Sequence, residues 1–331
     1  MTLSRATGNA ARKIMLRISS ILIALLVSLA PCAAQTQSGR AINGEVELGY
    51  WVQGPEDGPP VMLINGQGVG TRIGDDALVD AFLSKGYRVV TFDNRDSGQS
   101  TILRTAGAPP QTETIRTALS AGLRPTVAYD LSDMATDAIA VLDAANIDGA
   151  HVLGHSLGGM IAQVVAAQHP QRVLSLISVS ATSGESGLPF GPALTKLSDP
   201  QTFASMEFVE AQIKAYRIFE GDASVRMSDD EIAARVDADT AAADPNAAAR
   251  QGSAVTATGD RRPLLETIVA PALVIHGSDD PWFPIDHAQS TAAVLGAPLE
   301  VIDGMGHIIA DAAARTVVDR VSDFIQNLPA Q

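Results

Sequence analysis

The chain has 331 residues, 46% of them hydrophobic, and its 23 basic and 37 acidic residues give a net charge of −14 at neutral pH. This balance is the opposite of the basic footprint that nucleic-acid binding requires, so we expect no nucleic-acid partner. It also disfavours long-range attraction to anionic lipid headgroups.

The first 34 residues have the charge order of a secretory signal. Basic residues precede an apolar run at 18–30, which small residues follow; the basic ones are Arg5, Arg12, Lys13 and Arg17. The apolar run is shorter than the roughly 20 residues that a membrane-spanning helix needs, and no later run is longer. We therefore expect a signal peptide over 1–34, export to the periplasm or the medium, and no transmembrane segment after its removal.

Cys32 is the only cysteine of the chain and lies inside the predicted signal. An exported protein cleaved between Ala34 and Gln35 would therefore have no disulfide and no thiolate for chemistry or metal binding. Acylation of Cys32, as in a bacterial lipoprotein, is the weaker alternative. The residue before an acylated cysteine is normally Gly, Ala or Ser, and here it is Pro31.

The 297 residues after the signal alternate between strand and helix patterns, as expected for one large domain with an insertion. The predicted helices are at 75–85, 127–145 and 156–168, with a last amphipathic helix around 317–324. The predicted strands are at 41–52, 61–64, 87–92, 151–153, 173–179, 272–275 and 299–302. Continuous Val, Ile and Leu in strands that alternate with helices predict an α/β fold with a mostly parallel sheet covered on both faces.

The alternation is interrupted over residues 184–262, where apolar residues recur at helical spacing, as in Val209, Ile213 and Tyr216. We predict a helical cap there, inserted between the core segments 35–183 and 263–331. The aromatic residues of this segment could line a pocket, although helix packing explains them more simply; they are Phe190, Phe203, Phe208, Tyr216 and Phe219.

A G-x-S-x-G sequence centred on Ser156 follows a predicted strand and opens a predicted helix. This is the context of a nucleophile elbow, in which a serine sits on a sharp strand-to-helix turn. Glycines flank such a serine because side chains there would strike the neighbouring strand and helix. The free N–H groups at the start of the helix favour negative charge that develops beside the serine.

An acid and a base follow the serine in the chain order that a nucleophile elbow requires. A serine hydroxyl needs a base to take its proton, and the base needs an orienting carboxylate. Asp279 and Asp280 follow the strand at 272–275, and His307 follows the strand at 299–302. Three catalytic residue types, each after its own strand, favour a Ser-His-Asp arrangement.

With these motifs the chain resembles the α/β-hydrolase superfamily, and more closely the esterase-like branch that includes aclacinomycin methylesterase. The resemblance covers the chain after the signal, apart from the insertion. Besides the elbow, it is based on H-G-x-x-D-x-x-x-P at 276–284, G-x-G-H at 304–307 and D-x-R-x-x-G-x-S at 93–100. It implies an α/β-hydrolase fold with a helical cap, and no cofactor or metal.

Matched residue by residue, the resemblance makes Ser156 the nucleophile, Asp280 the orienting acid and His307 the base. Asp279 is then a turn residue. The other histidines have packing or surface interpretations; they are His151, His155, His169, His276 and His287.

The resemblance also implies an oxyanion hole formed by the backbone amides of Leu157 and Gln67. The loop that carries Gln67 departs from the family pattern, because Asn65 stands where the family has His. The same loop, with Gly66, Gly68 and a later acidic residue, imitates a dinucleotide fingerprint, but Thr71 stands where the third glycine should be. Acidic pairs in 229–239 suggest a calcium site only weakly, since the glycine of an EF-hand loop is missing.

The leading hypothesis is an exported serine hydrolase that cleaves a small carboxylic ester through an acyl-enzyme on Ser156. A serine at this position argues against haloalkane dehalogenases and epoxide hydrolases, which use aspartate. Carbon–carbon bond hydrolases and cofactor-free perhydrolases share the triad and stay open as alternatives. A ligand-binding relative with little turnover is the alternative from another class. The sequence leaves the substrate's identity and the oligomeric state open.

Overall fold

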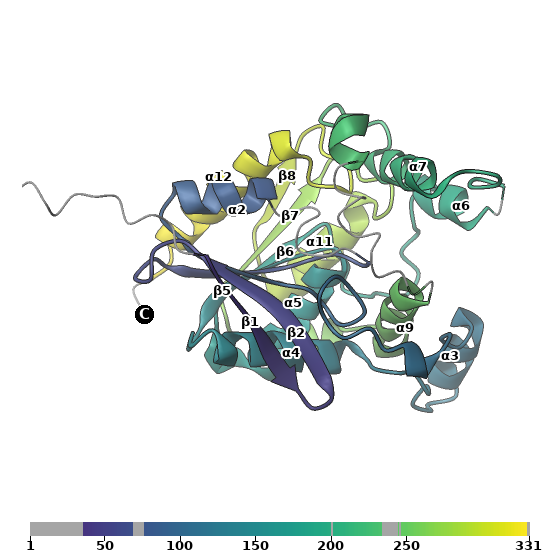
Figure 1. Ribbon diagram of the computed structural model, residues 1–331, viewed down its shortest axis with the longest axis horizontal. Helices are drawn as coiled ribbons and strands as arrows, with labels where there is room; N and C mark the ends of the chain where they lie inside the picture. The colour runs from purple at the N-terminus through teal and green to yellow at the C-terminus, as the bar shows by residue number, and fades with distance from the viewer. Residues whose placement is uncertain (1–35, 69–75, 200, 234–243, 245, 330–331) are drawn as a thin grey trace, which may run out of the picture. The chain divides into compact units, whose positions relative to one another are not determined.

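The computed structural model describes residues 36–68, 76–199, 201–233, 244 and 246–329. The predicted signal peptide and Cys32 lie outside these residues, as does Thr71. An eight-stranded sheet runs through the described chain in the order β1-β2-β4-β3-β5-β6-β7-β8 (Figure 1). Its strands are β1 Gln37–Asn43, β2 Val46–Gln53, β3 Pro60–Ile64, β4 Arg88–Phe92, β5 Ala150–His155, β6 Val173–Val179, β7 Ala272–Gly277 and β8 Leu299–Ile302.

The predicted α/β architecture is confirmed, because β3 to β8 pair in parallel. The single strand predicted at 41–52 is wrong: a hairpin joins β1 and β2 there. Gly44 makes the turn with φ 60°, a left-handed conformation that glycine adopts without steric cost. Only β2 then pairs with β4, antiparallel to it.

Helices cover both faces of the sheet, which explains why its strands are apolar at successive positions. Val61 and Leu63 of β3 pack with α2 (Asp76–Ser84) and α12 (Asp311–Gln326) on one face. Met62 and Ile64 pack on the other face with α4 (Leu131–Ala144) and α5 (Leu157–Gln168). Alternate side chains of a strand point to opposite faces, so both sets must be hydrophobic.

The helix predicted at 127–145 begins only at Leu131, because Asp130 caps it. The Asp130 carboxylate accepts from the amides of Ser132 and Asp133, which satisfies two donors of the first turn. Two other helices were not predicted, α3 (Thr112–Ser120) and α11 (Ile285–Leu295). Short 3₁₀ turns lie at Arg104–Ala106 and Pro170–Arg172. No described helix is both long and apolar enough to span a membrane.

Between β6 and β7 lie α6 (Pro192–Ser198), α7 (Phe208–Glu220), α9 (Ala247–Thr258) and α10 (Arg262–Leu265), and residues 229–233 are helical as well. In Figure 1, α6 and α7 lie together beyond the end of the sheet, and α9 lies beside α3. The helical spacing predicted in α7 agrees with its packing, since Val209, Ile213 and Tyr216 contact one apolar cluster. The cap boundaries at 184 and 262 stay a prediction.

The D-x-R-x-x-G-x-S motif after β4 ties its loop to α4. The Arg95 guanidinium donates two hydrogen bonds to the Asp137 carboxylate, at 2.6 and 2.7 Å. Both side chains are almost fully buried. Such a bidentate pair orients the loop strongly, because neither charge has water as an alternative partner.

The strand order places two loops side by side at the carboxyl ends of the central strands β3 and β5. The chain passes from β3 to β4 on one side of β3 and then returns to β5 on its other side. In the β3–β5 register, Ile64 is opposite Gly154. The loop after β3 and the turn after β5 therefore leave the sheet next to each other, and ligands of α/β sheets bind at such a switch point.

Candidate active site

Ser156 occupies a strained turn between β5 and α5. Its backbone has φ 55° and ψ −118°, a conformation that residues with a side chain rarely adopt. Close packing holds it there: a Cβ added at Gly158 would lie 1.9 Å from the Ile64 carbonyl oxygen, and one at Gly154 would lie 2.0 Å from the Gly158 oxygen. The two glycines of the motif are thus required by the approach of α5 to β3 and β5.

A chain of two hydrogen bonds joins Ser156 to a carboxylate. His307 Nε2 lies 3.0 Å from Ser156 Oγ, and His307 Nδ1 lies 2.8 Å from Asp280 Oδ2. The three residues come from different loops at the carboxyl ends of β5, β7 and β8. If Nδ1 carries the proton that it donates to Asp280, Nε2 is free to accept the proton of the Ser156 hydroxyl.

Asp280 and not Asp279 contacts His307. Asp280 Oδ1 accepts hydrogen bonds from the Trp282 and Phe283 amides at 2.8 and 2.9 Å, so both of its oxygens are occupied. Burial by itself raises the pKa of Asp280, but His307 and the backbone donor outweigh it and leave that pKa below the ordinary value. Asp279 is exposed and accepts from the Ser278 hydroxyl.

The turn that carries His307 is held by the end of α7 and the segment after it. The His307 amide donates to the Phe219 carbonyl at 3.0 Å, and the Val225 amide donates to the Gly304 carbonyl at 3.2 Å. A Cβ at Gly306 would lie 2.6 Å from the Glu220 carbonyl oxygen, so the two segments touch through their backbones. The sequence analysis missed this role of Phe219 and Glu220, because a backbone carbonyl has no signature in the sequence.

Aromatic rings surround the His307 imidazole. The rings of Phe219 and Phe283 each have their centre 5.5 Å from that of His307, and Trp282 packs against both. Phe219 belongs to α7, whereas Trp282 and Phe283 follow β7. These rings shield the His307–Asp280 hydrogen bond from water, which strengthens it. At least one aromatic side chain of the inserted segment, that of Phe219, therefore contacts the site.

Among the described residues, no histidine other than His307 forms a hydrogen bond with the Ser156 side chain. His155, the variable residue of the elbow motif, donates from Nε2 to the His307 carbonyl at 2.7 Å. Burial, with a smaller effect from the His307 ring, lowers the pKa of His155 to about 4. His276 contacts the Phe283 carbonyl at 2.8 Å and so supports the loop of Asp280. The side-chain partner of His151 is Ser175, and that of His287 is Thr182.

The loop after β3 lies against the elbow. A Cβ at Gly66 would be 3.5 Å from Ser156 Cβ, so the following amide, that of Gln67, is close to the serine. Leu157 is the first residue of α5, whose first amides have no acceptor within the helix. Among the described residues neither amide has a hydrogen-bond acceptor. Asn65, which replaces the family's His, is buried, and the Asn94 side chain donates to its carbonyl.

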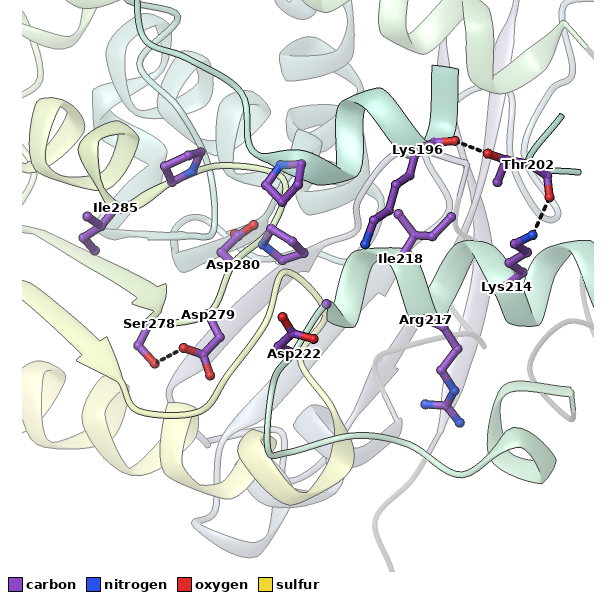
Figure 2. Close-up of a pocket in the computed structure, with 14 residues that line it drawn as sticks. Lys196, Thr202, Lys214, Arg217, Ile218, Asp222, Ser278, Asp279, Asp280 and Ile285 are labelled. Atoms are coloured by element: carbon purple, nitrogen blue, oxygen red, sulfur yellow. Dashed lines mark hydrogen bonds between the residues drawn. The ribbon is translucent and has the colours of Figure 1, made fainter. Parts of the chain in front are cut away.

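A cavity of about 790 Å³ lies between the inserted helices and the loop of Asp280. Figure 2 shows Asp280 at one wall, with Lys196 of α6 and Ile218 of α7 facing it. Ser156 and His307 are not among its lining residues. The cavity therefore borders Asp280 and not Ser156. The described residues contain no cluster of three potential metal ligands, and Asp237 and Asp239 lie outside them.

The close contact of Gly158 predicts a steric test of the elbow. We expect Gly158→Ala to lower the free energy of unfolding by about 1–3 kcal/mol, because the methyl group would overlap the Ile64 carbonyl. Labelling of Ser156 by a fluorophosphonate should slow by roughly tenfold or more, since the serine is displaced. Gly149→Ala is the control, because a Cβ there meets its neighbours at 3.5 Å, an ordinary contact. Equal stability and labelling in the two variants would contradict the steric argument.

The low pKa of His155 predicts that its ionisation does not control the site. With a pKa of about 4, His155 is neutral above roughly pH 5. We expect His155→Gln, which keeps a donor for the His307 carbonyl, to leave the midpoint of the acid limb unchanged when Ser156 labelling is followed against pH. A moved midpoint would identify His155 as the ionising group.

Comparison with known protein families identifies two matching segments. A sequence profile described as the alpha/beta hydrolase fold matches residues 59–199, and one described as serine hydrolase matches residues 222–317. The first segment includes β3 to β6 and Ser156, and the second includes Asp280 and His307. Together they span both sides of the insertion.

Two kinds of hydrolase are among the relatives that align with most of this chain. Rhodomycin D methylesterase of Streptomyces sp. strain C5 is 29% identical, over 80% of this chain and 90% of the relative. The 2-hydroxy-6-oxononadienedioate/2-hydroxy-6-oxononatrienedioate hydrolase of Paraburkholderia xenovorans strain LB400 is 27% identical, over 80% and 86%. The structure of a meta-cleavage product hydrolase from Pseudomonas fluorescens IP01 superposes with a TM-score of 0.67, at 20% identity, over 87% of this chain and 97% of that one.

The parallel sheet, the elbow after β5 and both matching profiles agree with one another. The chain belongs to the α/β-hydrolase superfamily and resembles its esterase-like branch.

Proposed function

We propose that this hydrolase is a serine hydrolase that cleaves a carboxylic ester of a small molecule through an acyl-enzyme. The observation that carries the proposal is the pair of hydrogen bonds from Ser156 through His307 to Asp280, at 3.0 and 2.8 Å, on a serine held in an elbow. This geometry suits removal of the serine proton by an oriented imidazole. The methylesterase relative, aligned over 80% of the chain, supports the ester as the bond cleaved.

In the proposed first step, Ser156 Oγ attacks the ester carbonyl carbon while His307 Nε2 takes the hydroxyl proton. The carbonyl oxygen becomes negative and accepts hydrogen bonds from the amides of Leu157 and Gln67, the proposed oxyanion hole. Asp280 stabilises the imidazolium without taking its proton. The ester bond then breaks, the alcohol leaves with the proton from His307, and the acyl group stays on Ser156.

In the second step a water molecule replaces the alcohol. His307 takes a proton from this water, whose oxygen attacks the acyl carbon, and the same two amides bind the new oxyanion. Collapse of this intermediate releases the carboxylic acid and returns the proton to Ser156 Oγ. The step consumes one water molecule per ester and restores the starting enzyme.

Labelling with a fluorophosphonate tests this proposal. We expect the wild-type protein to be labelled on the peptide containing Ser156, and Ser156→Ala to lose both labelling and ester turnover by at least about 10³-fold. Asp280→Asn should lower kcat by up to about 10⁴-fold, because the amide favours the wrong imidazole tautomer. Asp279→Asn is the matched control and should retain wild-type kcat. A folded wild-type protein that resists labelling and hydrolyses no ester would refute the proposal and favour a ligand-binding relative.

Cleavage of a carbon–carbon bond is the second candidate. It is favoured by the relative named as a 2-hydroxy-6-oxononadienedioate hydrolase, which aligns over 80% of this chain. The same triad serves both reactions, so the substrate must distinguish them. Turnover of methyl and p-nitrophenyl esters is compared with turnover of a vinylogous 1,5-diketone to distinguish the two reactions. Turnover of the diketone alone would contradict the ester proposal and support carbon–carbon bond cleavage. A perhydrolase would instead form peracid from acetate and hydrogen peroxide.

We further propose that the protein is exported by the segment 1–34. The proposal is based on its charge order and apolar run. Expression of the full chain in a Gram-negative host should yield periplasmic protein whose N-terminus, read by mass spectrometry, is Gln35. Replacing Arg12, Lys13 and Arg17 by Glu should leave the protein in the cytoplasm. An acylated N-terminal Cys32 would establish the lipoprotein alternative, and an uncleaved chain in the cytoplasm would contradict export.

A further inference from the structure

A buried amide from α9 joins the loop after β3, which lies against the elbow, to the loop after β4. The side chain of Gln251 is fully buried. Its Oε1 accepts a hydrogen bond from the Gly68 amide at 2.7 Å, and its Nε2 donates to the Arg95 carbonyl at 2.7 Å. Gly68 lies in the loop after β3, and Arg95 lies in the loop after β4.

The chemistry of the partners determines the orientation of this amide. The Gly68 N–H can only donate, and the Arg95 carbonyl can only accept. Rotating the Gln251 amide by 180° would bring donor against donor and acceptor against acceptor. The side chain is therefore held in one orientation, and removing it would leave the buried Arg95 carbonyl without its donor and the Gly68 N–H without its acceptor.

Other contacts between α9 and the loop after β3 reinforce this link. The Gln67 side chain donates to the Ala248 carbonyl at 2.8 Å. A Cβ at Gly252 would lie 3.1 Å from the same Gln67 nitrogen. Gly68 has φ 70°, so the loop turns sharply at the residue that Gln251 holds. Residues 67 and 68 are thus fixed from the α9 side, while Gly66 touches Ser156 on the other side.

We propose that Gln251 is a positioning residue for the oxyanion hole. By accepting the hydrogen bond of the Gly68 amide, Gln251 fixes the backbone on the carboxyl side of Gln67. It thereby fixes the orientation of the adjacent peptide group between Gly66 and Gln67, which carries the Gln67 N–H. The inference rests on the proposed hydrolase function, since the oxyanion forms only during acyl transfer. Oxyanion donors act only when they are pre-aligned, so a loosened loop slows the reaction without weakening substrate binding.

The test compares Gln251→Leu with wild type on a p-nitrophenyl ester. We expect kcat to fall by roughly tenfold or more. The fall should be smaller than the roughly 10²–10³-fold loss of kcat that follows removal of a whole oxyanion donor. KM should change by less than about twofold. A trifluoromethyl ketone, which Ser156 Oγ converts into a hemiketal oxyanion as His307 takes the proton, should bind more weakly by a similar factor. If Gln251→Leu does not fold, Gln251→Met carries the same measurement, because its flexible side chain adapts to the site.

Gln163→Leu is the matched control. Gln163 is also a fully buried amide. Its hydrogen-bond partners are Ser178 and Arg261, and neither belongs to the loop after β3. We expect it to lower the melting temperature as Gln251→Leu does, yet to retain kcat and ketone affinity within about twofold. Equal losses of kcat in both variants, or unchanged kcat in Gln251→Leu, would overturn the positioning role alone. A wild-type protein that is not labelled on Ser156 would overturn the proposed function, and this role with it.

Discussion

The close approach of α5 to the ends of β3 and β5 is the constraint on which the site depends. Gly158 lies so near the Ile64 carbonyl that no side chain fits between them. This packing holds Ser156 in a backbone conformation that a serine would not adopt alone. The strain leaves the hydroxyl at the tip of a turn and brings the start of α5 beside it. The proposed nucleophile and the start of α5, which carries one proposed oxyanion amide, are therefore both positioned by this packing contact.

The segment between β6 and β7 supports this arrangement from two sides. The end of α7 accepts the His307 amide through the Phe219 carbonyl, and α9 binds the loop of Gln67 through Gln251. The proposed base and the proposed oxyanion loop thus both contact the inserted helices. At these contacts α7 and α9 hold the two loops in place.

The geometry of the proposed triad does not select the substrate. Esters and vinylogous diketones both present a carbonyl carbon to a serine, and a methylesterase and a 2-hydroxy-6-oxononadienedioate/2-hydroxy-6-oxononatrienedioate hydrolase both align with most of this chain. Selection depends on the shape of the space around Ser156 and on the aromatic rings near His307, where Phe219 of α7 meets Trp282 and Phe283. These rings come from segments far apart in the sequence, so their meeting follows from the fold.

Local patterns predicted most of the fold. The apolar runs of β3 to β7 were visible because burial on both faces of the sheet demands hydrophobic residues. The helical spacing in α4, α5 and α12 was visible because these helices pack against the sheet. The errors have local causes as well. The alternating pattern at 41–52 continues through the turn at Gly44, so one strand was predicted where a hairpin forms. The helix α3 was not predicted: it has only nine residues, and only Ile115 of it is buried.

The sequence by itself determined the fold class, the elbow motif and the chain order of Ser156, Asp280 and His307, because each depends on residue types within a few positions. Only the tertiary structure decided that the partners of the site include Phe219 and Gln251, whereas its contact between His307 and Asp280 agrees with the assignment that the resemblance implied. Gln251 is 183 residues from Gly68 along the chain. A hydrogen bond over such a separation exists only after the sheet and the inserted helices have packed, so no local pattern records it.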